Sequence, residues 1–354
     1  MPTKEDVIQA LKSVVDPELG VDIVSLGMVK DVSTEGDTIK VTLELTTPAC
    51  PFRSQLKGNV ESVLKRLAGV SEVKVDVVAR VAPARTEDGI LPGVKNIIAI
   101  ASGKGGVGKS TVAVNVGLAL SETGASVGIL DADIYGPTIP KILRIKIGPA
   151  SVGNKIVPAI SYNGIKVMSI GFLLQDEEPV IWRGPLVTNA IRQFLTQVEW
   201  GELDYLIVDL PPGTGDASLT LAQSIPLTGV VIVSTPQDAA LRIATKALNM
   251  FRKLNVEIIG IVENMSYFVC PNCGHISEIF GRGGVKAACE RLGTRFLGEV
   301  PLSPDIRVNG DLGNPVIIAA PKSESTEAFR RIAYAIASSV SVITYKRKGM
   351  GGGS

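Results

Sequence analysis

The chain has 354 residues, 45% hydrophobic and 20% charged, a composition typical of a globular protein rather than a disordered one. Its 36 basic and 35 acidic residues leave a net charge of +1, which argues against a nucleic acid as partner. No run approaches the ~18 apolar residues of a membrane span, and the N-terminus, MPTKEDVIQA, lacks a signal peptide's apolar core, so we expect a cytoplasmic protein of about two domains, with no membrane partner.

The N-terminal region is predicted to form a small α+β domain over residues 1–81. Its elements alternate between helical spacing of apolar residues and strand composition. They are a helix over 4–15, a strand over 38–45, a helix over 52–67 and a strand over 73–81. The following residues, 82–95, concentrate proline, glycine and charge and are predicted to be a linker.

Beyond the linker, short apolar runs alternate with helical segments, a pattern that predicts an α/β domain with a mainly parallel sheet over residues 96–345. The runs are 97–101, 126–130, 205–208, 229–233, 258–262 and 315–319. A closing helix is expected over 324–343. Residues 346–354, which end in GMGGGS, are predicted to be a disordered tail.

A phosphate-binding loop follows the first of these apolar runs and precedes a helix, the context that this motif requires. Its glycines allow the backbone to approach a polyphosphate, while Lys109 is placed to reach the terminal phosphates and Ser110 to ligate magnesium. The expected ligands are therefore a polyphosphate and Mg²⁺. The loop and the residue after it comprise Gly103, Lys104, Gly105, Gly106, Val107, Gly108, Lys109, Ser110 and Thr111.

Carboxylates follow two of the predicted strands. Asp131 and Asp133 come after SVGIL, and Asp209 comes after YLIV. Ligands of open α/β sheets collect at the carboxyl ends of the strands, which places all three near the loop. A carboxylate there can hold the metal or orient the attacking water in phosphoryl transfer, and the spacing alone does not separate Asp131 from Asp133.

The chain has four cysteines and one histidine, His275. Cys270 and Cys273 form a Cys-x-x-Cys pair, a spacing shared by metal sites and thioredoxin-type redox pairs. A tetrahedral thiolate site needs four ligands, which two subunits can supply across a twofold axis. A shared zinc ion or a shared four-iron, four-sulfur cluster fits that count.

Lys104, directly after the first glycine, makes the loop resemble that of the deviant P-loop group, which includes MinD, ParA and the nitrogenase iron protein. Further segments make the chain similar, from 96 to 343, to the Mrp-type ATP-binding iron-sulfur carrier family. They are SGKGGVGKST at 102–111, LDADIYGPTIP at 130–140, RGP at 183–185, DLPPGTGD at 209–216, TPQDAAL at 235–241, ENMSYFVCPNCG at 263–274 and IFGRGG at 279–284.

This resemblance implies an ATP hydrolase that works as a homodimer, assembles an iron-sulfur cluster on the paired cysteines and hands it to apoproteins. In that family pattern Lys104 contacts nucleotide across the dimer and Asp133 orients water. Asp209 belongs to the magnesium shell, and Asn264 reads adenine.

The N-terminal region resembles the SufT and PaaD type of iron-sulfur assembly domain through Asp16-Pro17-Glu18 and TTPACP at 46–51, with Met28 where leucine is usual. This likeness points to other assembly factors as partners. Cys50, at the start of a predicted helix, is expected to have a favoured thiolate and is either a transient cluster ligand or a small buried residue. Cys289 is expected in the core and His275 in a turn.

The alternative hypothesis is a positioning ATPase of the MinD or ParA class, with a structural zinc or no metal at the cysteine pair. That class predicts a terminal amphipathic membrane helix or a basic DNA-binding face. The closing helix is apolar and serine-rich around 337–341, and the net charge is near zero. Neither property favours the alternative.

Overall fold

The computed structural model describes residues 2–84, 90–173 and 184–351. The chain divides into a smaller unit, residues 1–82 with 337–354, and a larger unit, residues 83–336. Within the described ranges, no helix combines the length and apolar character needed to cross a membrane. The grouping differs from the predicted domains at the C-terminal end, where residues 337–345 fall with the smaller unit.

The smaller unit is a three-stranded sheet on which two helices pack. Central strand β2 runs antiparallel to β1 and parallel to β3. Residues alternate between buried and half-buried along β2, as its period-2 pattern predicts, whereas β1 was not predicted because its sequence, VKDVSTE, is mostly polar. The elements are α1 (Lys4–Leu11), β1 (Val29–Glu35), β2 (Thr38–Leu45), α2 (Arg53–Leu64) and β3 (Glu72–Ala79).

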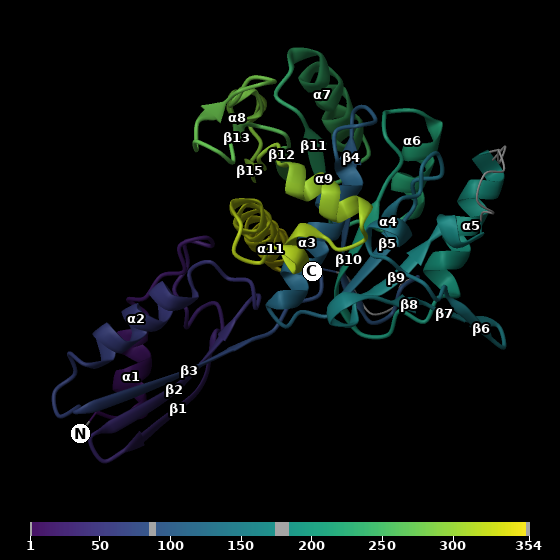
Figure 1. Cartoon of the computed structure of the whole chain (residues 1–354). Helices are drawn as coiled ribbons and strands as arrows, with labels where there is room; N and C mark the ends of the chain where they lie inside the picture. The colour runs from purple at the N-terminus through teal and green to yellow at the C-terminus, as the bar shows by residue number, and fades with distance from the viewer. Residues whose placement is uncertain (1, 85–89, 174–183, 352–354) are drawn as a thin grey trace. The chain divides into compact units, whose positions relative to one another are not determined.

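The larger unit is built on an eight-stranded sheet of order β15-β12-β11-β4-β10-β5-β9-β8 (Figure 1). Every neighbouring pair is parallel except β8 with β9. This arrangement confirms the predicted mainly parallel α/β fold. The strands are β4 (Val94–Ser102), β5 (Val127–Asp131), β8 (Ala159–Ile160), β9 (Lys166–Ser169), β10 (Leu203–Asp209), β11 (Gly229–Ser234), β12 (Ile258–Glu263) and β15 (Phe296–Glu299).

Helices and short hairpins connect these strands. The helices are α3 (Lys109–Glu122), α4 (Ile139–Ile142), α5 (Gly184–Thr196), α6 (Asp216–Ser224), α7 (Asp238–Lys253), α8 (Gly284–Leu292), α9 (Pro304–Asp311), α10 (Val316–Ala319) and α11 (Glu324–Gly351). The hairpins are β6 (Ala150–Val152) with β7 (Lys155–Val157), and β13 (Phe268–Val269) with β14 (Ile276–Ser277). Two 3₁₀ turns cover Tyr162–Gly164 and Ile170–Leu173.

Burial explains why the central strands read as continuous apolar runs. β11 is buried along its whole length, and β4 and β10 each have one half-buried position. Helix α3 packs on β4, β5 and β10 and is buried without a break from Val112 to Leu120. The loop that precedes α3 therefore rests on a rigid part of the sheet.

The predicted strand over 315–319 is wrong. In the structure Pro315 is the N-cap of the short helix α10, in which Val316 and Ile317 are buried. A short apolar run has no period that separates a buried strand from a buried helical turn. The edge strand of the sheet is instead β15, whose sequence FLGE has too few apolar residues to be recognised.

The prediction of a disordered tail is wrong for residues 346–351, because α11 continues to Gly351. Lys346 and Arg347 are good helix formers, and their positive charges suit the carboxyl end of a helix dipole. Residues 352–354 lie outside the described part of the chain.

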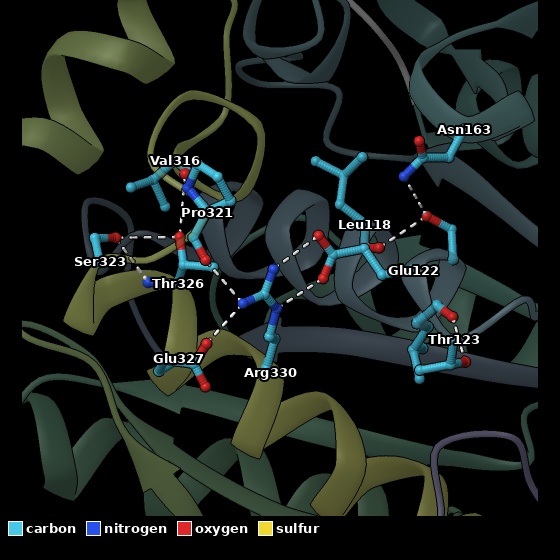
Figure 2. Close-up of polar contacts among 12 residues, drawn as sticks. Leu118, Glu122, Thr123, Asn163, Val316, Pro321, Ser323, Thr326, Glu327 and Arg330 are labelled. Atoms are coloured by element: carbon cyan, nitrogen blue, oxygen red, sulfur yellow. Dashed lines mark hydrogen bonds and ion pairs between the residues drawn. The ribbon is translucent and has the colours of Figure 1, made fainter.

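Arg330 ties the end of α3 to the start of α11 (Figure 2). Its guanidinium donates to both carboxylate oxygens of Glu122, at 2.8 and 3.0 Å, and to Oε1 of Glu327 at 2.6 Å. It also donates to the carbonyl of Pro321 at 2.8 Å. Only 23% of the Arg330 side chain is exposed, so this bidentate pair is partly shielded from solvent.

We expect Arg330→Gln to lower the free energy of unfolding by about 1–3 kcal/mol, because Glu122 loses a bidentate partner and the Pro321 carbonyl loses a donor. Urea unfolding followed by the fluorescence of the buried Trp200 measures the change. Arg307→Gln is the matched control, since Arg307 and Asp311 form an exposed i,i+4 pair worth only about 0.5 kcal/mol. An equal loss of unfolding free energy in the two variants would contradict a structural role for the Arg330 contacts.

Candidate active site

The phosphate-binding loop connects the end of β4 to the start of α3, as predicted. Gly106 and Gly108 have φ angles of 76° and 81°, and Gly108 is the N-cap of α3. Both angles lie in the left-handed region, which glycine adopts without strain. The loop thereby turns its backbone toward a helix N-terminus, an arrangement suited to an anionic ligand.

Two glycines are required because other groups approach the loop closely. A Cβ on Gly103 would lie 2.5 Å from the carbonyl carbon of Ile243 and 2.6 Å from the nitrogen of Ala244, both backbone atoms of α7. A Cβ on Gly108 would lie 2.2 Å from Nδ2 of Asn264. The loop is therefore packed against α7 on one side and Asn264 on the other.

Lys109 lies between two carboxylates. Its Nζ is 2.6 Å from Oδ1 of Asp209 and 3.2 Å from Oδ2 of Asp133, and only 6% of its side chain is exposed. Burial acts to lower the pKa of Lys109, but the two negative charges outweigh it and leave this pKa above its usual value. The ammonium thus keeps its charge at neutral pH, as binding to phosphate requires.

Ser110 donates a hydrogen bond of 2.5 Å to Oδ2 of Asp209. Asp209 is fully buried at the end of β10, and burial raises its pKa above the usual value despite the opposing charge of Lys109. A hydroxyl beside a carboxylate is the oxygen donor set that Mg²⁺ uses in P-loop proteins. These two residues therefore fit the metal predicted from the sequence.

The structure gives Asp131 and Asp133 different contacts. The Asp131 carboxylate accepts hydrogen bonds from Ser169 Oγ at 2.9 Å and from the backbone nitrogens of Asp133 and Ile139 at 3.2 and 3.3 Å. Burial, with the charge of Asp209, raises the pKa of Asp131 to about 7. Asp131 therefore holds the turn after β5, whereas Asp133 reaches Lys109.

A cavity of about 490 Å³ opens beside the loop. Its lining includes loop residues, Asn264, Met265 and the segment leading into α9. The Asn264 side chain donates a 2.8 Å hydrogen bond to the carbonyl of Val107. Asn264 therefore lines the cavity and is bonded to the loop.

Lys104 is half-buried, and its carbonyl accepts a hydrogen bond of 2.9 Å from Ser102 Oγ. Among the residues that the structure describes, no ion pair involves its ammonium. Lys104 thus differs from Lys109, whose charge is paired inside the same subunit.

Cys270 and Cys273 lie in the turn between β13 and β14. The amide of Cys270 donates to the carbonyl of His275 at 2.9 Å, and the amide of Gly274 donates to the carbonyl of Cys270 at 2.9 Å. Hydrogen bonds from the backbone of Asn272 and Cys273, and then from the side chain of Cys273, lower the pKa of the Cys270 thiol. The turn therefore presents two partly or fully exposed thiols, one with a favoured thiolate.

No group of three or more potential metal-ligating side chains occurs within residues 2–84, 90–173 and 184–351. His275, expected in a turn, is exposed and does not complete a site with the two cysteines. A single subunit therefore offers two thiolate ligands at the hairpin.

The remaining cysteines have a different character. Burial raises the pKa of Cys50 to about 11, and the same cause raises that of Cys289 to about 11. The expected thiolate at Cys50 is therefore wrong, because desolvation outweighs the influence of the helix that begins at Arg53. Cys289 lies in the core of the larger unit, as predicted.

Sequence reasoning gave no role to Glu263, which is fully buried at the end of β12 and next to Asn264. Its position after an apolar strand is the same signal that identified Asp209. The RGP segment cannot be compared in full, because Arg183 lies outside the described residues.

A sequence profile described as "NUBPL iron-transfer P-loop NTPase" matches residues 93–337. The chain belongs to this family. A second profile, described as "Iron-sulfur cluster assembly protein", matches residues 4–77. These two matches confirm the family resemblances predicted for both parts of the chain. Membership of a P-loop NTPase family supports ATPase activity in general terms.

Relatives of this family match nearly the whole chain. An iron-sulfur cluster carrier protein of Synechocystis sp. is 48% identical over 349 residues, 97% of this chain and 99% of its own. One of Deinococcus radiodurans is 46% identical over 343 residues, 96% of each chain. One of Escherichia coli is 43% identical over 325 residues, 91% of this chain and 88% of its own.

Two solved structures share the fold of the larger unit. A nucleotide-binding protein from Archaeoglobus fulgidus in complex with ADP is 41% identical, covers 69% of this chain and 97% of its own, and has a TM-score of 0.60. The cell division ATPase MinD of Pyrococcus furiosus is 22% identical, covers 68% of this chain and 98% of its own, and has a TM-score of 0.53. The second likeness concerns the fold alone.

Proposed function

We propose that the protein is an ATP-dependent iron-sulfur cluster carrier that holds its cargo between two copies of the chain. The observation that carries this proposal is the hairpin with two accessible cysteines in the same unit as a complete phosphate-binding loop. The curated relatives bear the name of cluster carriers, which supports the same assignment.

The cargo would be a four-iron, four-sulfur cluster with four thiolate ligands. Each hairpin contributes Cys270 and Cys273, so two copies related by a twofold axis supply the full set. The favoured thiolate of Cys270 suits this role, since the thiolate is the form that binds metal. Apoproteins would receive the cluster, and other assembly factors are expected partners.

The nucleotide would be ATP, held with its phosphates on the loop amides and on Lys109. Mg²⁺, bound by Ser110 and Asp209, would neutralise charge on the phosphates during hydrolysis. Asp133 would orient the attacking water, and Asn264 would contact adenine.

Lys104 would act across the dimer, on nucleotide bound to the partner. Its ammonium is not engaged by a carboxylate among the described residues, which supports a role outside its own subunit. ATP binding would then favour the closed dimer, in which the two hairpins also meet. Hydrolysis would reverse this preference and promote transfer of the cluster.

The test is the content of iron, acid-labile sulfide and zinc after anaerobic purification and reconstitution. We expect about four iron and four sulfide per dimer in the wild type and almost none in the Cys270→Ser, Cys273→Ser double variant. Cys50→Ser is the matched control, because its thiol is half-buried, has a raised pKa and lies outside the hairpin, so the change should leave the cluster content unchanged.

Stoichiometric zinc without sulfide would replace the cluster by a structural zinc site, which uses the same thiolates. Absence of any cysteine-dependent metal would favour a positioning ATPase of the MinD or ParA class. A double variant that keeps its iron and sulfide would refute the ligand role of the pair.

A further inference from the structure

The buried carboxylate of Glu263 gathers three hydrogen bonds. Its Oε1 accepts from Ser266 Oγ at 2.5 Å and from the amide of Gly283 at 2.9 Å, and its Oε2 accepts from the amide of Val285 at 2.8 Å. Gly283 is the N-cap of α8, so the carboxylate satisfies amides that the helix leaves without internal partners. Glu263 therefore joins the end of β12 to the start of α8.

Arg282 extends this network. Its guanidinium donates to Glu299 at 2.5 and 3.1 Å and lies 4.2 Å above the ring centroid of Tyr267. Ser266 Oγ is 3.0 Å from the same Glu299 carboxylate, and the Tyr267 hydroxyl donates to Glu324 at 2.5 Å. Planar stacking and a bidentate pair both fix the orientation of an arginine.

These contacts close the base of the cysteine hairpin. The segment 268–281 contains β13, the cysteine turn and β14. It lies between Tyr267, which is buried, and Arg282, whose side chain is partly exposed. Because the guanidinium rests on the ring, the two ends of the segment are held together. We call the side chains that hold this base the clasp: Glu263, Ser266, Tyr267, Arg282 and Glu299.

The clasp also adjoins the nucleotide cavity. Asn264 and Met265, which line that cavity, lie in sequence between Glu263 and Ser266. Asn264 is bonded to the loop carbonyl of Val107, and Met265 has a φ of 57°, so this short connection has a fixed, strained conformation. Asn264 and Met265 connect Glu263 to Ser266, which both belong to the clasp. A displacement of Asn264 would therefore move residues of the clasp.

We propose that the clasp positions the cysteine hairpin relative to the nucleotide cavity, so that occupation of the cavity changes the accessibility of the cysteine pair. This inference rests on the proposed function, in which nucleotide gates the hand-off of the cluster. It assigns a role to the IFGRGG segment, in which Arg282 supplies the stacked cation and Gly283 the amide bound by Glu263.

The test measures alkylation of Cys270 and Cys273 by iodoacetamide, resolved by mass spectrometry in the metal-free, full-length chain. Rates are compared without nucleotide, with Mg-ADP and with the non-hydrolysable analogue Mg-AMP-PNP. In the wild type we expect the analogue to change the rate by about fivefold or more, the size of an ordinary coupling between sites. Cys289, which is buried, serves as an internal check of folding.

In Arg282→Gln the nucleotide effect should fall below about twofold, while the Kd for nucleotide stays within about threefold of the wild type, because Arg282 does not line the cavity. Arg282→Lys keeps the charge but loses the fork that grips Glu299, and should restore the effect only in part. Lys155→Gln, which removes an exposed ion pair with Glu199, is the matched control and should behave as the wild type.

The proposal is overturned if Arg282→Gln keeps the full nucleotide effect, or if nucleotide leaves the wild-type alkylation rates unchanged. The readout needs no metal, so it is independent of the cluster assignment. If nucleotide changes the alkylation rates but the protein binds no cluster, the clasp proposal stands and the carrier function is contradicted. If the protein binds a cluster but nucleotide leaves the rates unchanged, the carrier function stands and the clasp proposal is contradicted.

Discussion

Lys109→Ala is expected to weaken nucleotide binding by at least about 100-fold, or about 3 kcal/mol, because the loop loses the buried ammonium proposed to bind the terminal phosphates. Isothermal titration with Mg-ATP and Mg-ADP measures the loss. The change also leaves Asp209 without its cation, so circular dichroism and a urea titration must accompany the binding data.

Lys104→Ala provides the comparison within the same loop. Because the Lys104 ammonium has no carboxylate partner among the described residues, we expect nearly normal stability and nucleotide affinity but a much lower rate of hydrolysis. Normal ATP affinity in Lys109→Ala would contradict the assigned loop, and unchanged hydrolysis in Lys104→Ala would contradict its action across a dimer.

Gly103→Ala should destabilise the larger unit by about 2–3 kcal/mol and reduce nucleotide affinity with it. The added methyl would meet backbone atoms of α7 at 2.5 and 2.6 Å, and a helix backbone cannot give way as a flexible side chain can. Differential scanning fluorimetry and urea unfolding without nucleotide measure the effect on the fold.

Gly105→Ala is the matched substitution, since a Cβ there meets nothing within 4 Å and the residue is exposed. Its free energy of unfolding should stay within about 0.5 kcal/mol of the wild type. Equal stability of the two variants would mean that the close approach of Gly103 to α7 is relieved at little cost.

Much of the fold was predictable because the central strands are buried on both faces and therefore apolar throughout. β4, β5, β10, β11 and β12 were all recognised in this way. β9 and β15, nearer the edges, have shorter and more mixed sequences and were not recognised. The apolar run at 315–319 was wrongly predicted to be a strand, because its residues are buried in a helical turn rather than in a sheet.

The nucleotide side of the site was predictable because the glycines, Lys109 and Ser110 are fixed by local spacing, and Asp209 by its place after a strand. Spacing alone did not separate Asp131 from Asp133, and only the family resemblance favoured Asp133. Their different contacts depend on residues distant in sequence, since Asp131 is bonded by Ser169 and Asp133 lies beside Lys109.

The clasp could not have been derived from spacing alone. Its contacts join Glu263, Arg282 and Glu299, which only the folded sheet and α8 bring together. Cys50 shows the same limit, since its place before a helix suggested an ionised thiol and burial reversed the preference.

Binding of a polyphosphate to the Lys109 ammonium would be an exchange of counter-ions, because two carboxylates already lie beside that ammonium. A polyphosphate that takes the ammonium must displace Asp133 and Asp209, which would then face its negative oxygens. A divalent cation arriving with the polyphosphate would offset that repulsion, so we expect the anion and the cation to bind together. Because the ammonium is already neutralised by its partners, the loop should exert little long-range attraction on unrelated anions.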